Sequence, residues 1–138
     1  MAIGGTVSKP VWVKDGMYLS DTADADITIG NLVKLSATGV DVAGAGDDAI
    51  GVAVGGNRFS RTADDDVIES GQKVTFATRG IVNVLTDASA IVVGSYVKSG
   101  ASGVAVLSAA GTGTMAVGIA LEANSSAAAT IQIKLLRG

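Results

Sequence analysis

The strongest constraint on the fold is a segment that this chain of 138 residues contains twice. Residues 30–42 align with residues 94–106, and seven of the thirteen aligned pairs are identical. The identical pairs are Gly30/Gly94, Val33/Val97, Lys34/Lys98, Ala37/Ala101, Gly39/Gly103, Val40/Val104 and Val42/Val106. After a three-residue insertion the match resumes, because IGVAV at 50–54 corresponds to VGIAL at 117–121. Two copies are too few for a solenoid, so the repeat, at about 30–54 and 94–121, predicts two related motifs that complete one domain.

Each copy has the pattern of three short strands. A glycine-containing turn and a loop of small residues separate three runs rich in Val, Ile and Leu. A further strand is predicted after each copy, as KVTFAT at 73–78 and as TIQIKLL at 130–136, where apolar and polar residues alternate. In the intervening IVNVL, Val82 and Val84 point inward if Asn83 points to water.

The composition favours the same fold class. With 19 Gly, one Pro and 4% aromatic residues, the core must be built from Val, Ile, Leu and Ala. β-Branched residues suit a half-buried sheet, and glycine suits tight turns. We therefore predict an all-β fold: a small β-barrel or sandwich built from two related β-motifs, with an extended N-terminal arm.

The domain organisation follows from the position of the repeat. We expect an N-terminal arm at 1–15 and a single β domain at 16–138. The charged segment from Gly55 to Gly71 is predicted to be a long exposed loop. The segment that starts at Thr86 is compatible with one helical turn or with a strand at 91–93. No basic start with a long apolar run is present, so we expect a soluble chain without a cleaved signal or a membrane span.

The absence of His and Cys excludes several classes of chemistry. Without these residues, zinc and haem sites lose their usual ligands, and Ser-His or Cys-His nucleophile pairs cannot form. The net charge of −3 is unevenly distributed, with eleven acids and five bases at 1–70 against two acids and five bases at 71–138. No cluster of Lys and Arg is available for phosphates, so we expect no direct contact with nucleic acid. The asymmetry fits either complementary faces in an assembly or an unevenly charged solvated surface.

Three motifs have both a functional and a structural interpretation. The run Asp64–Asp66 with Glu69 lacks the spaced ligands and central glycine of a calcium loop, which favours an exposed loop. DTADAD at 21–26 lacks the same features, although spacing alone does not exclude paired carboxylates that meet in space. GTGTMA at 111–116 fits a dinucleotide fingerprint, but no helix follows and the repeat places it in a loop. We therefore expect no metal, no cofactor and no catalytic residue.

The N-terminal arm contains the best candidate for a binding site. Pro10, Val11, Trp12 and Val13 form a short β-prone apolar stretch outside the repeat, with the only Pro and the only Trp of the chain. Trp is enriched among the residues that dominate binding energy in protein interfaces. The alternative is that Trp12 covers one end of the barrel.

Several segments together resemble the small capsid decoration, or cement, proteins of tailed bacterial viruses. They are GNLVKL and GSYVKS, the TGV and SGV turns, AIGVAV and AVGIAL, VTFATRGIVNV and the terminal ATIQIKLLRG. The resemblance covers about residues 30–138. Where that family often has Asp after the turn glycine, this chain has Asn31 and Ser95, which also suit a turn.

The resemblance implies a viral structural protein that binds the outer surface of an assembled capsid and stabilises it against internal pressure. It implies the major capsid protein as partner, a homotrimer on the shell, and a location in the virion, with the host cytoplasm during assembly. Residues 10–13 would then bind the capsid by adding a strand to it or lying along it.

Two other classes of function remain open at this point. One is a fibre-associated or receptor-binding β-domain that recognises glycans. The other is a small hydrolase, for which the lack of His leaves only Ser-Lys or paired-carboxylate chemistry. We expect that the chain is not an enzyme.

Overall fold

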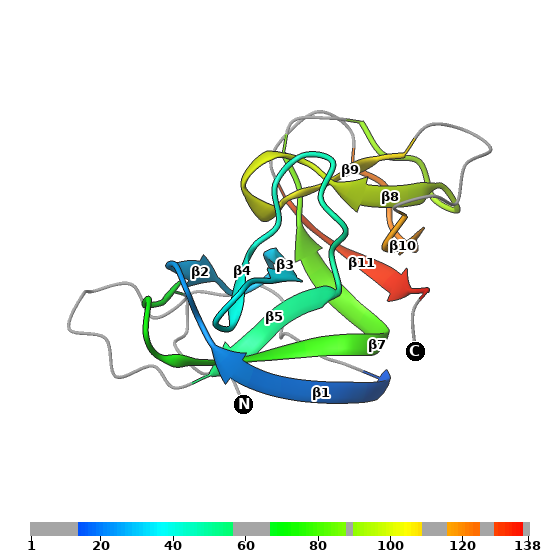
Figure 1. Ribbon diagram of the computed structural model, residues 1–138. Coiled ribbons are helices and arrows are strands. Elements are labelled where there is room, and N and C mark those ends of the chain that lie inside the picture. The colour runs from blue at the N-terminus through cyan, green and yellow to red at the C-terminus, as the bar shows by residue number, and fades with distance from the viewer. Residues whose placement is uncertain (1–13, 57–66, 88–89, 109–115, 125–128, 137–138) are drawn as a thin grey trace.

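The computed structural model describes residues 14–56, 67–87, 90–108, 116–124 and 129–136. The strands are β1 (Lys14–Thr22), β2 (Ile27–Thr28), β3 (Leu32–Leu35), β4 (Val40–Val42), β5 (Gly51–Gly56), β6 (Val67–Ile68), β7 (Lys73–Leu85), β8 (Tyr96–Ser99), β9 (Ala105–Leu107), β10 (Gly118–Ala120) and β11 (Thr130–Leu135). One 3₁₀ turn, η1 (Ala101–Gly103), is the only helical element of the described residues. The prediction of an all-β fold is confirmed, as a strongly curled sheet (Figure 1).

The main sheet has nine strands, and its order is symmetric about its centre. The strands follow the order β4-β3-β5-β7-β11-β10-β8-β9, with β1 also paired to β7, and β2 and β6 form a separate pair. Strands β3, β4 and β5 come from the first copy of the repeat, and β8, β9 and β10 from the second. Each half therefore has the same neighbours in the same sequence, and the two halves meet where β7 pairs with β11.

The two copies share their hydrogen bonds as well as their strand order. Leu32 pairs with Val52 in the first copy, as Tyr96 pairs with Ile119 in the second. The amide of Gly30 donates to the carbonyl of Ala53, and the equivalent amide of residue 94 donates to the carbonyl of residue 120, both at 2.8 Å. The backbone geometry is thus repeated even where the side chains differ.

The structural repeat extends well beyond the repeat found in the sequence. Thr22 pairs with Lys73 at the end of β1, and Leu85 pairs with Thr130 at the end of β7 in the same register. Ala23 then forms a parallel bridge to β4, as Thr86 does to β9. We call residues 14–79 the first unit and residues 80–135 the second unit.

Strand β7 belongs to both units. Its first half pairs with β1 and β5, and its second half pairs with β11. Figure 1 shows the strand bending sharply between these halves. Gly80 lies at this junction with φ of +104°, a conformation that glycine adopts without steric cost. The two units are therefore joined by a continuous strand.

Each unit has a core made of equivalent residues. Eight buried positions correspond between the units: Ala23/Thr86, Ile27/Ile91, Val33/Val97, Val40/Ala105, Ala53/Ala120, Ile68/Asn124, Val74/Ile131 and Phe76/Ile133. The first-unit members form the smaller core cluster. The larger core cluster joins the interior of the second unit to the outward side of the first-unit sheet. The centre of the first-unit sheet, at Leu32 and Val33 on β3, Val52 and Ala53 on β5, and Phe76 and Ala77 on β7, is consequently buried on both sides.

One hairpin breaks the equivalence by a single residue. The β3–β4 hairpin closes with Leu35 opposite Val40, and the β8–β9 hairpin closes with Ser99 opposite Ala105. The extra residue is accommodated in η1, where Ser102 has a left-handed φ of 58°. The gap-free sequence alignment is therefore shifted in β9, and Val42 corresponds in space to Leu107 instead of Val106.

The prediction that the segment from Gly55 to Gly71 is a long exposed loop is wrong for parts of this segment. Strand β5 continues to Gly56, and Val67 and Ile68 form β6 against β2. Ile68 is fully buried in the smaller core cluster, because its partner Ile27 lies there too. Residues 57–66, including the Asp64–Asp66 run, lie outside the described residues.

Strand β7 also differs from its sequence-based interpretation at one residue. Val82 and Val84 are fully buried, as expected for the inward side of the strand. Asn83, which was expected to face water, is only 3% exposed. Both sides of the second half of β7 are therefore covered.

The close approach of β5 to β7 provides a test of the fold. A Cβ added at Gly51 would overlap the backbone carbonyl of Ala77, and one added at the equivalent Gly118 would lie 2.6 Å from the carbonyl oxygen of Lys134, which is less close but still too close. We predict that Gly51→Ala lowers the free energy of unfolding by about 1–3 kcal/mol, as overpacking does. Gly55→Ala on the same strand is the matched control, because its added Cβ meets nothing within 4 Å. Denaturant unfolding of the two variants checks this, and equal stabilities would contradict it.

Candidate interaction surfaces

Asp24 and Asp26 of the DTADAD segment accept hydrogen bonds from residues in other turns of the chain. The carboxylate of Asp24 accepts hydrogen bonds from the hydroxyls of Ser36 and Thr38, the latter at 2.9 Å. The carboxylate of Asp26 accepts one from the backbone amide of Ser70 at 2.9 Å. Within the described residues, no group of three or more His, Cys, Asp or Glu could hold a metal ion. The arrangement gives these carboxylates a structural role.

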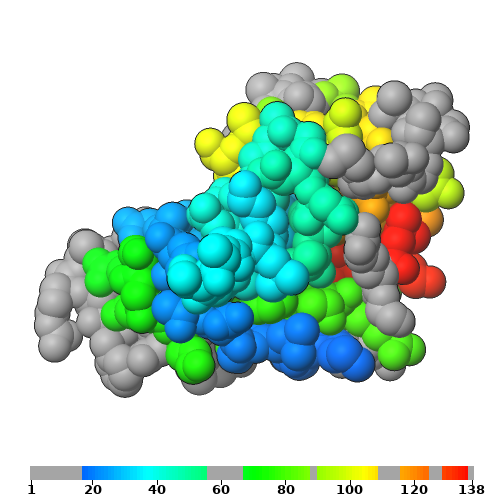
Figure 2. Space-filling model, in the orientation of Figure 1, coloured from blue at the N-terminus to red at the C-terminus, as the bar shows by residue number. Residues whose placement is uncertain are grey.

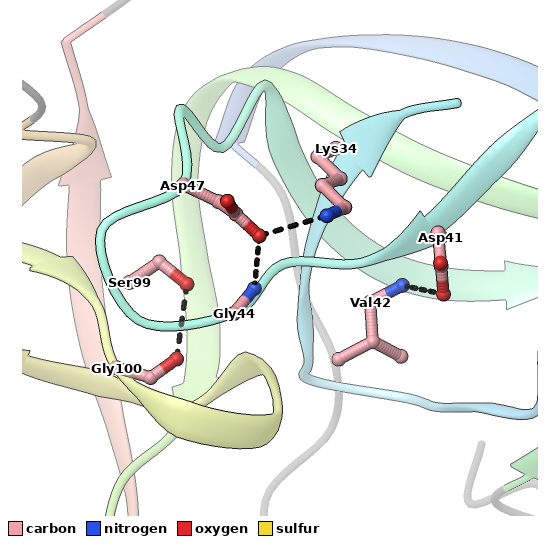
Figure 3. Close-up of polar contacts among 7 residues, drawn as sticks. All are labelled: Lys34, Asp41, Val42, Gly44, Asp47, Ser99 and Gly100. Atoms are coloured by element: carbon pink, nitrogen blue, oxygen red, sulfur yellow. Dashed lines mark hydrogen bonds and ion pairs between the residues drawn. The ribbon is translucent and has the colours of Figure 1, made fainter. Parts of the chain in front are cut away.

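A polar network fixes the loop between β4 and β5. Figure 3 shows the ammonium of Lys34 on β3 and the backbone amide of Gly44 meeting the same carboxylate oxygen of Asp47. The two distances are 2.9 and 2.7 Å. The hydrogen bond from Lys34 is the main cause that lowers the pKa of Asp47, and the same bond raises the pKa of Lys34. This loop carries Ala43 and Ala49 into the larger core cluster.

The two units meet through close contacts between non-equivalent parts of the fold, chiefly the β8–β9 hairpin of the second unit and β4 and the β2–β3 turn of the first. A Cβ on Gly103 in the β8–β9 hairpin would lie 2.7 Å from a methyl of Val42. The side-chain amide of Asn31 donates to the carbonyl of Ser102 at 3.4 Å. The amide of Leu85 donates to the carbonyl of residue 30 at 2.9 Å. Figure 2 shows the first unit, in blue to green, lying directly against the yellow atoms of the second.

The surface of the first unit in this contact is mainly apolar. We call it the packed face, and it consists of Gly30, Leu32, Val52, Val54 and Ala77, with Val42 at its edge, where Val42 meets Gly103 and also packs against the smaller core cluster. Leu32, Val52 and Ala77 are fully buried because the second unit covers them.

The equivalent surface of the second unit is largely exposed. We call it the open face, and it consists of Gly94, Tyr96, Ile119, Leu121 and Lys134, with Leu107 at its edge, where it pairs with the buried Val97. Tyr96, Leu107 and Leu121 are 40%, 43% and 40% exposed. The chain thus presents an apolar surface at positions that are buried in its own first unit.

A second apolar surface lies on β1. Met17, Tyr18 and Leu19 are 49%, 51% and 50% exposed, so both sides of this strand present apolar side chains. Among the described strands, β1 pairs only with β7. An edge strand with unpaired backbone groups is a template for pairing with another chain.

The candidate residues chosen from the sequence precede this strand. Pro10, Val11, Trp12 and Val13 lie outside the described residues, so their role in binding stays a prediction. Strand β1 begins at Lys14, directly after them. The sequence reasoning missed the exposed apolar residues of β1, although MYL at 17–19 stands out between polar residues.

Comparison with known proteins identifies the family. Residues 5–135 match the family described as XM1 gp53 minor capsid protein. The chain belongs to this family of phage minor capsid proteins. It is therefore a virion structural protein associated with a bacteriophage capsid, as the sequence resemblance implied.

A solved structure has a similar fold. It is described as the crystal structure of head fiber gp8.5 N base in bacteriophage phi29, and the match has a TM-score of 0.54 at 17% sequence identity. The match covers 89% of this chain and 96% of the other. No curated protein matches the chain. None of the helices that the structure describes is long and apolar enough to cross a membrane.

The Lys34–Asp47 pair gives this minor capsid protein a predicted pH dependence. Because the pKa of Asp47 is lowered on folding, its contribution to stability is complete above the ordinary pKa of 3.8 and is lost as the pH falls through the lowered value. A double-mutant cycle with Lys34→Met and Asp47→Asn should give a favourable coupling at about pH 7 and a smaller one at about pH 2. Urea unfolding measures each variant. A coupling that is the same at both pH values would contradict the assignment.

Proposed function

We propose that this minor capsid protein binds the outer surface of the assembled capsid and stabilises it against internal pressure. Its partner is the major capsid protein, and binding takes place on shells assembled in the host cytoplasm. Membership of a minor capsid family supports an association with the capsid. The observation that carries the proposed mode of binding is β1, an edge strand with three half-exposed apolar residues that follows residues 10–13 directly.

The proposed contact is an extension of a sheet. The main-chain donors and acceptors on the outer edge of β1 would pair with an extended segment of the capsid protein, and residues 10–13, which precede β1 in the sequence, would add to this contact. The apolar side chains at 17–19 supply contact area beside these hydrogen bonds. The pairing of β1 with β7 is continuous from Tyr18 with Ala77 to Thr22 with Lys73 and irregular between Lys14 and Tyr18. A partner would therefore dock on an edge that β7 holds in place over its second half.

The proposed role is mechanical and not enzymatic. In the part of the chain that the structure describes, the acids of the DTADAD segment are engaged in turns, and no cluster suited to a metal occurs. A homotrimer on the shell would link three such contacts, and linked contacts bind far more strongly than a single one. Many weak contacts of this kind can clamp neighbouring capsid subunits.

A second candidate function has one observation in its favour. The likeness to a head fibre base supports the chain acting as the attachment base of a fibre on the capsid. Copy number separates the two functions, because a clamp of capsid subunits occupies many positions on each virion and a fibre base occupies few. Quantitative mass spectrometry of purified virions measures that number.

The capsid-binding proposal predicts the effect of two changes near β1. Deletion of residues 1–13 and the substitution Leu19→Asp should each leave a folded protein that binds undecorated shells at least about tenfold more weakly, because apolar contacts and main-chain pairing are lost. Co-sedimentation of purified protein with shells measures binding. Leu136→Asp is the matched control, since Leu136 has a similar exposure of 43% but lies after β11.

Three results of this experiment would decide against the proposal. They are full binding by both altered proteins, an equal loss with the control variant, and no binding of the unaltered chain above background. Circular dichroism confirms that each variant is folded before its binding is measured.

A further inference from the structure

We propose that the open face of the second unit is the contact between copies of this chain, and that the β3–β4 hairpin of the next copy occupies it. The inference rests on the homotrimer of the proposed function and names the surfaces that build it. The contact would repeat, between two copies, the contact that the two units make within one chain.

The first step is the equivalence of the two faces. Leu32 on the packed face pairs with Val52, and both are fully buried beneath the second unit. Tyr96 and Ile119 form the same pair on the open face, yet Tyr96 is 40% exposed. The same backbone surface is therefore covered once and uncovered once in each chain.

The second step is the chemistry of the uncovered surface. Leu107 corresponds to Val42, which packs against the β8–β9 hairpin, and Leu121 corresponds to Val54, which packs against the larger core cluster. Both leucines are large apolar residues and both are 40–43% exposed. Neighbouring exposed apolar residues of this kind mark interaction sites on soluble proteins.

The third step identifies the occupant. The packed face is covered in part by the β8–β9 hairpin, through Ser102 and Gly103. That hairpin is already in use within its own chain. Its equivalent in the first unit, the β3–β4 hairpin, is exposed, and Leu35 at its base is 64% exposed where the equivalent Ser99 is 1% exposed. A hairpin with an exposed leucine and a largely exposed apolar face thus occur on opposite units of each copy.

Charged residues on the two surfaces also bear on the contact between the open face and the β3–β4 hairpin. Lys134 stands on the open face at the position of Ala77 and is exposed. The β3–β4 hairpin is bound to the carboxylate of Asp24 and leads into Asp41 on β4. Asp41 lies opposite Lys34 in this hairpin, so the favourable charge contact would be one between Lys134 and the carboxylates of Asp24 or Asp41, whereas two open faces packed together would bring two copies of Lys134 together.

The geometry of such a contact limits the assembly. Each copy would use two different surfaces, so the interface is heterologous, and heterologous contacts close into rings when the rotation permits. A three-membered ring is the assembly that the proposed homotrimer requires. An isologous dimer, in which the open face packs on itself, would not use the hairpin at all.

The experiment uses two variants that each damage one surface. Leu121→Asp places a charge on the open face, and Leu35→Asp places one on the hairpin. Each variant alone should be monomeric in native mass spectrometry, with association weakened by about tenfold or more relative to the unaltered oligomer. An equimolar mixture should form a one-to-one dimer and nothing larger, because it contains a single intact pair of surfaces.

The controls separate this proposal from capsid binding. Leu19→Asp should leave the oligomer intact, since β1 takes no part in the contact, whatever its effect on shell binding. Tyr96→Asp replaces Leu121→Asp if the latter does not fold, as shown by circular dichroism. A monomeric unaltered protein, an intact oligomer of Leu35→Asp, or a mixture without a dimer would each overturn the proposal. The shell-binding result stands independently of all three.

Discussion

The pairing of β7 with strands from both units is the interaction on which the structure depends. The first half of β7 pairs with β1 and β5 and is the last strand of the first unit. The second half pairs with β11 and is the first strand of the second unit. A continuous strand leaves no linker about which the units can rotate. Ala77 and Val82 lie on either side of Gly80, and both belong to the larger core cluster. Backbone hydrogen bonding and apolar burial therefore fix the relation between the units together.

The two units share their backbone pairing but differ in what their outer surfaces can do. In the second unit, Lys134 occupies the position that Ala77 has in the first unit, and Tyr96 occupies the position of Leu32. The strand pairs around these positions have the same register in both units. Sheet geometry is set by main-chain bonds and by the alternation of side chains, so one side of a strand can change while the core side is retained. This separation allows a repeated fold to bury one copy of a surface and expose the other.

The sequence predicted those parts of the fold in which the local pattern was strong. The strands at 32–35 and 96–99 were visible because each lies between glycine-containing turns in the repeat, and the strand at 130–135 was visible because apolar and polar residues alternate in it. Ile68 was missed because its two-residue strand follows a charged run, and it is buried only through pairing with Ile27. The extra residue of the β8–β9 hairpin was also invisible, since Ser102 absorbs it by a local backbone change.

The interaction surfaces could not be found from the sequence for a related reason. Tyr96 and Leu32 occupy equivalent positions in two similar segments, and both are apolar, so pattern alone assigns them the same burial. Only the packing of the first unit against the second distinguishes them, because the second unit covers Leu32 while Tyr96 stays 40% exposed. In the proposed contact between copies, the exposed member of two equivalent faces would supply the binding surface, so side-chain differences on one backbone plan would separate folding from binding.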